Sequence, residues 1–89
     1  MIKVKRRNTK NFEVAVIEHG SSTIHTVILD DDYYQSLTER KITKEDFVKK
    51  CFDFLLERES KESILSSFNV KVINSYFTDF EQYIKGKIC

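Results

Sequence analysis

The sequence contains no proline, no tryptophan and only two glycines among its 89 residues. Because Gly20 and Gly86 are the only glycines, the chain has no glycine-rich loop of the kind that binds phosphate. The two cysteines, Cys51 and Cys89, are far apart and do not have the spacing of zinc ligands. These absences exclude the sequence motifs by which many nucleotide-binding and zinc-binding proteins are recognised.

Long hydrophobic runs and an excess of charge of one sign are also absent. The apolar runs fall far short of the roughly 18 residues of a membrane-spanning helix, and the N-terminus does not resemble a signal peptide. Fifteen basic and fourteen acidic residues give a net charge of +1, so no overall field attracts nucleic acid or an acidic membrane. We therefore expect a cytoplasmic protein with reduced cysteines and no membrane partner.

The chain does contain enough apolar material for one folded core. Hydrophobic residues make up 40% of the sequence and charged residues 33%, an ordinary balance for a globular protein. A chain of this length forms one domain rather than two. We predict a single α+β domain over residues 1–89, with a three-stranded antiparallel meander over residues 1–29 and a helical part of three to five helices over residues 30–89.

Alternating or β-branched residues near the N-terminus predict the strands of this meander. Short polar turns separate the strands, which favours antiparallel neighbours. With four-residue turns, Arg6 is expected opposite Glu13 and Glu18 opposite Thr23. The predicted strands are residues 2–7, 12–18 and 23–29.

The two faces of the predicted sheet are both largely apolar. We expect one of them to face the core, and it carries Phe12, Val14, Val16, His25, Val27 and Leu29. The opposite face is unusually apolar for a sheet surface exposed to water. Either helices of the same chain or a second copy of the sheet should cover it, and this is the main indication of a homodimer. The residues of that face are Glu13, Ala15, Ile17, Ile24, Thr26 and Ile28.

Capping signals divide residues 30–89 into helices. Asp30 is a plausible N-cap, and Thr43 opens a variant capping box that ends at Asp46. Ile42 and Phe47 have the spacing of a hydrophobic staple at the same helix start. Residues 70–73 fit either a strand or a helix, and we favour a helix. The predicted helices begin after Asp30, at Thr43, at Ser60, at Asn69 and at Thr78, and they reach residues 37, 59, 68, 77 and 86.

The segment Phe52–Phe77 resembles a set of short bacterial proteins. It reads Phe-Asp-Phe-Leu-Leu-Glu-Arg-Glu-Ser-Lys-Glu-Ser-Ile-Leu-Ser-Ser-Phe, followed by Val-Ile and Tyr-Phe. In the similar proteins an "ExSIL" helix follows a strand pair and a long helix. The resemblance implies a compact stand-alone bacterial domain, and it implies no activity and no site residue.

Catalytic and metal sites are difficult to assemble from these residues. Cys51 could act as a nucleophile with His25 or His19 as its base, but its place on the inner side of a helix favours a buried apolar role. We expect His25 to lie hydrogen-bonded at the rim of the core. The acidic run of residues 30–32 could hold a hard cation, yet helix capping explains it more simply. We therefore predict no enzyme, no metal and no cofactor.

The basic N-terminal strand gives one alternative. Lys3, Lys5 and Arg7 share one side of the strand and could lie against phosphates. Lysines on an edge strand also prevent unwanted strand pairing, and we favour that role. Our leading hypothesis is a non-catalytic protein–protein interaction module, a homodimer joined through the sheet. The alternative is a nucleic-acid-binding or antitoxin-like regulator that uses the three basic residues.

Overall fold

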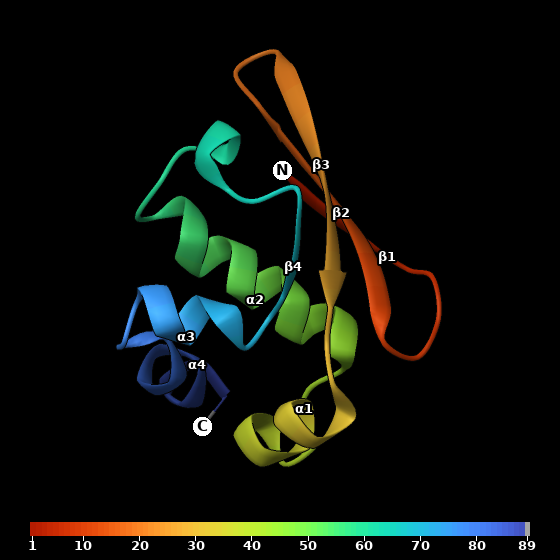
Figure 1. The fold of residues 1–89 in the computed structure, drawn as a ribbon, viewed down its shortest axis with the longest axis vertical. Coiled ribbons are helices and arrows are strands. Elements are labelled where there is room, and N and C mark those ends of the chain that lie inside the picture. The colour runs from red at the N-terminus through yellow and green to blue at the C-terminus, as the bar shows by residue number, and fades with distance from the viewer. Residues whose placement is uncertain (89) are drawn as a thin grey trace.

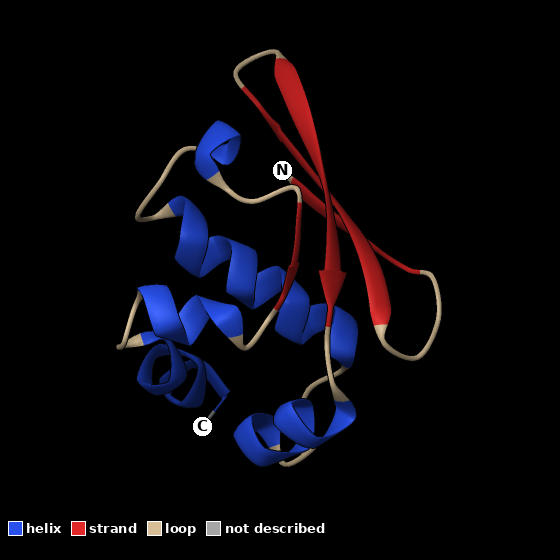
Figure 2. Cartoon of the chain, viewed as in Figure 1, coloured by secondary structure: helices blue, strands red, loops and turns tan. Residues whose placement is uncertain are grey.

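The protein consists of a four-stranded sheet with its helices on one side (Figure 1; Figure 2). The computed structural model describes residues 1–88. The strands are β1 (Ile2–Arg6), β2 (Asn11–Glu18), β3 (Ser21–Ile28) and β4 (Ser67–Asn69). The helices are α1 (Asp31–Thr38), α2 (Lys44–Leu56), a 3₁₀ turn η1 (Lys61–Ser63), α3 (Val72–Tyr76) and α4 (Phe80–Ile88).

The predicted α+β class is confirmed, but the sheet is larger than the predicted meander. Strands β1, β2 and β3 are antiparallel neighbours, and β4 joins β3 in parallel. The chain between β3 and β4 contains α1, α2 and η1, in keeping with the crossover that a parallel pair requires. The sheet order is therefore β1-β2-β3-β4.

The prediction of a helix from Ser60 to Phe68 is wrong. Only η1 is helical there, and the chain then extends into β4, so the "ExSIL" segment does not form an α-helix. Pairing with β3 explains the difference, because the N–H group of Thr26 donates to Ser66 and the carbonyl of Ile28 accepts from Val70. This long-range pairing outweighs the local helical pattern.

The register of β1 against β2 differs by one residue from our prediction. Lys5, rather than Arg6, lies opposite Glu13 because the turn begins one residue earlier. This register places Ile2 and Val4 on the side that packs against the core. A slip of one residue would have turned both apolar side chains to solvent, so burial selects the observed pairing.

The turn between β2 and β3 contains two residues instead of four. Glu18 pairs with Ser21 rather than with Thr23. His19 and Gly20 both have positive φ angles, 54° and 78°, which match the right-handed twist of a hairpin. The difference of two residues leaves the faces unchanged. The six residues predicted to face the core are all buried: Phe12, Val14, Val16, His25, Val27 and Leu29.

The start of the long helix α2 is confirmed in detail. The Thr43 hydroxyl accepts a hydrogen bond from the backbone N–H of Asp46 at 3.1 Å, and Ile42 packs against the core. The helix ends at Leu56, earlier than predicted. The terminal helix α4 continues past Gly86 to Ile88, so its predicted end at Gly86 is two residues too early.

Aromatic side chains fill the space between α2 and the C-terminal helices. The ring of Phe54 lies edge-on to Phe77, Phe80 and Tyr83, with centroid distances of 5.8, 5.2 and 4.9 Å. The guanidinium carbon of Arg58 lies 3.7 Å from the centroid of the Phe54 ring. Edge-to-face pairs of this kind stabilise beyond the area they bury. This cluster fixes α3 and α4 against α2.

Candidate binding surfaces

The sheet face that points away from the helices, here called the outer face, is not covered by residues 31–88 (Figure 2). Three large apolar side chains on it are exposed: Met1 by 72%, Ile17 by 38% and Ile24 by 54%. Cross-strand partners share a face, so the register defines its members. The outer face consists of Met1, Lys3, Lys5, Asn11, Glu13, Ala15, Ile17, Ser22, Ile24, Thr26 and Ile28, with Ser67 and Asn69 from β4.

The basic residues predicted from the sequence do not form one free cluster. Lys3 lies opposite Ala15, and Lys5 lies opposite Glu13. Arg7 follows β1 and forms an ion pair with Glu13. The hydrogen bond and the charge of Arg7, with a smaller effect from Lys5, lower the pKa of Glu13. A carboxylate therefore lies among the three cations, which weakens their attraction for phosphate.

His25 and Cys51 do not form a nucleophile–base pair. His25 is buried, and its Nδ1 lies 2.7 Å from the carbonyl oxygen of Leu65 while its Nε2 lies 2.8 Å from the Thr23 hydroxyl. Since the carbonyl can only accept, Nδ1 carries the proton. Cys51 is fully buried, and burial raises the pKa of its thiol. His25 therefore joins β3 to the segment before β4. Cys89 lies outside the described residues.

The acidic run after β3 makes structural contacts. Asp30 accepts a hydrogen bond from the side chain of Asn69 at 3.1 Å, and this bond lowers its pKa. Asp31 forms ion pairs with Lys44 at 3.1 Å and Arg40 at 3.2 Å. Asp30 occupies the N-cap position, but its side chain makes no capping hydrogen bond. Among residues 1–88, no group of three His, Cys, Asp or Glu side chains is placed to hold a metal ion.

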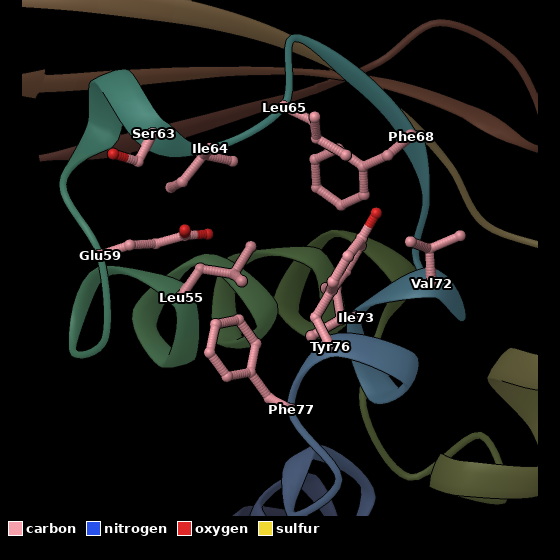
Figure 3. Close-up of a pocket in the computed structure, with 10 residues that line it drawn as sticks. All are labelled: Leu55, Glu59, Ser63, Ile64, Leu65, Phe68, Val72, Ile73, Tyr76 and Phe77. Atoms are coloured by element: carbon pink, nitrogen blue, oxygen red, sulfur yellow. The ribbon is translucent and has the colours of Figure 1, made fainter.

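A second surface lies at the β4 edge of the sheet, where α2, η1 and α3 surround an apolar pocket of about 240 Å³ (Figure 3). Its walls include Leu55, Phe68 and Ile73. Two further apolar side chains of the pocket are strongly exposed, Leu65 by 51% and Tyr76 by 68%. We call this feature the edge pocket.

The edge pocket has one acidic group. Glu59, which follows the C-terminal end of α2, directs its carboxylate across the pocket (Figure 3). Within residues 1–88 this carboxylate has neither a hydrogen-bond partner nor an ion-pair partner. The neighbouring Arg58 instead contacts Asp79 at 2.7 Å. The pocket therefore combines apolar walls with one unpaired negative charge.

The sequence did not predict the edge pocket, because residues 60–68 were expected to be helical. No local signal suggested it, because the run at residues 70–73 that also fitted a strand leads into α3, whereas β4 is formed by Ser67–Asn69. Over residues 1–88, no helix has both the length and the apolar character needed to cross a bilayer.

Comparison of the chain with protein family models, with curated proteins and with solved structures gives no match. Its function must therefore be inferred from its own surfaces.

Proposed function

We propose that the protein is a cytoplasmic, non-catalytic protein–protein interaction module that forms a homodimer through the outer face of its sheet. The observation that supports this proposal is the exposure of Met1, Ile17 and Ile24 on a face that the helices leave open. Ile17 and Ile24 are diagonal neighbours on adjacent strands, so their side chains form one patch. An exposed apolar patch of this kind is typical of an interaction surface.

A second copy is the occupant that best suits this face. Two sheets pack face to face at about 10 Å, with their strands within about 30° of each other. In a twofold dimer each patch contacts the same patch of its partner, so Ile24 of both subunits would lie near the axis. The charged residues Lys3, Lys5 and Glu13 would lie at the rim, where water remains.

Size-exclusion chromatography with light scattering tests the dimer. We expect twice the chain mass for the wild type and the monomer mass for Ile24→Lys, which places a charge in the centre of the patch. Gln82→Lys is the matched control, because it adds the same charge at an exposed position on α4 and should leave the dimer intact. A wild type that remains monomeric at high micromolar concentration would contradict the proposal.

Nucleic-acid binding is the second candidate. It is favoured by one observation: Lys3 and Lys5 are both exposed on the outer face, and Lys3 forms no ion pair within residues 1–88. Binding of DNA or RNA should then weaken steeply with salt and disappear when Lys3, Lys5 and Arg7 are changed to Ala. Glu13→Gln should strengthen it, because the substitution removes the negative charge among the three cations. Absence of binding at low salt would exclude this candidate.

A further inference from the structure

The outer edge of β4 presents unpaired backbone groups. In its parallel pairing with β3, the N–H of Thr26 donates to Ser66 and the N–H of Val70 donates to Ile28, both at 2.8 Å. Hydrogen bonds of a parallel pair involve alternate residues. The N–H and C=O groups of Phe68 therefore point to β3, and those of Ser67 and Asn69 point away from it. Among residues 1–88 no strand pairs with this edge.

The edge pocket lies directly beside these groups, on the inner side of the sheet. The ring of Phe68, from the middle of β4, forms one wall, and Tyr76 of α3 points toward it (Figure 3). At about 240 Å³ the pocket is smaller than the roughly 300–1,000 Å³ of most small-molecule sites. Its size suits one large apolar side chain.

A strand added to β4 would direct every second side chain into this pocket, because side chains alternate along a strand. Residues two apart on that strand lie about 7 Å from each other on the same face. When one of these two side chains fills the apolar part of the pocket, the other lies beside the pocket wall. A Lys or Arg there would complement the unpaired carboxylate of Glu59.

We propose that the edge of β4 and the edge pocket together bind an extended peptide segment of a protein partner as a fifth strand. The segment carries one large apolar side chain, which fills the pocket, and a Lys or Arg two residues away, which pairs with Glu59. Backbone hydrogen bonds to Ser67 and Asn69 hold the strand, and the two side chains determine which segment is accepted.

Binding can be measured by fluorescence anisotropy with labelled, capped heptapeptides. The probes are Thr-Val-Thr-Leu-Thr-Lys-Thr and the reversed order, so that both strand directions are sampled. We expect one of them to bind. Replacing its Lys by Glu should weaken binding roughly tenfold or more, because a charge-assisted contact becomes a repulsion. With the variant Glu59→Lys, the preference should invert and the Glu peptide should bind more tightly.

A matched pair of variants tests how much the backbone hydrogen bonds of β4 contribute to peptide binding. Ser67→Pro removes an N–H group that points away from β3, whereas Ser67→Ala shortens the side chain and keeps that N–H. We expect roughly fivefold weaker binding for Ser67→Pro and little change for Ser67→Ala. If the proline variant does not fold, N-methylated peptides test the same hydrogen bonds with the wild-type protein. Methylating the alternate amides that face β4 should abolish binding, and methylating the other amides should not.

The proposal fails if neither peptide binds, if Glu59→Lys leaves the preference for Lys unchanged, or if both sets of N-methylated peptides behave alike. It is independent of the homodimer. The monomeric variant Ile24→Lys should bind the peptide as tightly as the wild type, and the peptide should slow the exchange of the Ser67 and Asn69 amides. Chemical-shift changes at the side-chain methyl groups of Ile17 and Ile24, without slower exchange at Ser67 and Asn69, would place the peptide on the outer face and contradict the proposal.

Discussion

The two edges of the sheet are attached by different kinds of interaction. At the β1 edge, the N-terminal ammonium of Met1 donates to the carbonyl of Ile17 at 2.6 Å, and Arg7 pairs with Glu13. The side chains of this ion pair are 55% and 29% exposed. Exposed ion pairs contribute little to stability because water and salt screen them.

The β4 edge is attached by less exposed and more directional contacts. The buried His25 ring connects β3 to the carbonyl of Leu65, and it packs against Phe52 with a centroid distance of 5.3 Å. Asn69 within β4 bonds to Asp30 at the start of α1. Charged side chains therefore protect the longer β1 edge from unwanted pairing, whereas strand β4 itself carries no charged residue and is firmly positioned. A positioned, uncharged edge is the better template for a partner strand.

Of the changes considered, removing the His25 ring should destabilise the protein most, and it should loosen the β4 edge more than the β1 edge. We expect His25→Ala to lower the free energy of unfolding by about 2–4 kcal/mol, because it leaves a cavity beside Phe52 and a carbonyl without a partner at Leu65. Urea denaturation measures this loss. Amide exchange should show faster opening at Phe68 in β4 than at Lys5 in β1.

Thr23→Val is the matched control for that change. It keeps the His25 ring and removes only the hydrogen bond to Nε2, so we expect a loss of about 1 kcal/mol. Equal acceleration of amide exchange at Phe68 and Lys5 in His25→Ala would show that the ring supports the whole sheet. The difference between the edges would then not depend on His25.

Much of the fold was predictable because local signals agree with the tertiary structure. Alternation of apolar residues gave the three antiparallel strands, and the capping pattern at Thr43 gave the start of α2. The turn after Glu18 was predicted, but its length was not, because Ser21 and Ser22 are typical turn residues and yet belong to β3. The error changed the register by two residues and left the buried face correct.

The edge pocket was not predictable in the same way. Strand β4 has three residues, Ser67, Phe68 and Asn69, and so short a segment has no periodic pattern. Its partner β3 lies about forty residues earlier in the chain, and the bond between His25 and Leu65 spans the same distance. Such pairing depends on how α2 packs, which no local signal reveals. The outer face, in contrast, could be predicted because β1, β2 and β3, which form most of it, follow one another in sequence.

Removing the Asn69 side chain should have an intermediate effect. The Asn69 side chain donates a hydrogen bond to Asp30 and accepts one from the backbone N–H of Lys71, each at 3.1 Å. Both hydrogen bonds are partly exposed to water. We expect Asn69→Ala to cost about 1 kcal/mol in urea denaturation.

Asn69→Asp sharpens this test through its dependence on pH. The substitution keeps the acceptor for Lys71 but places a second carboxylate beside Asp30, so at neutral pH it should destabilise more than Asn69→Ala. Protonation of one carboxylate relieves the repulsion, so the loss should shrink as the pH falls into the acidic range. A loss that does not change with pH would show that Asp30 and Asn69 are not in contact.

Removing the Arg7 charge should have the smallest effect and should also depend on pH. Arg7 lowers the pKa of Glu13 in the folded state, so the pair stabilises the fold above the ordinary pKa of a glutamate. That contribution is lost as the pH falls through the lowered pKa. Urea denaturation should therefore show a small deficit for Arg7→Ala at pH 7, which disappears in strong acid and in high salt.

Arg6→Ala provides the matched comparison at the same edge. Arg6 contacts the carbonyl of Asn8 at 3.3 Å and has no acidic partner within residues 1–88, so its small effect should not change with pH. If the loss of stability in Arg7→Ala is equally independent of pH, the ion pair with Glu13 does not hold the β1 edge in solution. Arg7 would then be free to guard the edge or to contact phosphate, and the nucleic-acid candidate would gain the cation that Glu13 now neutralises.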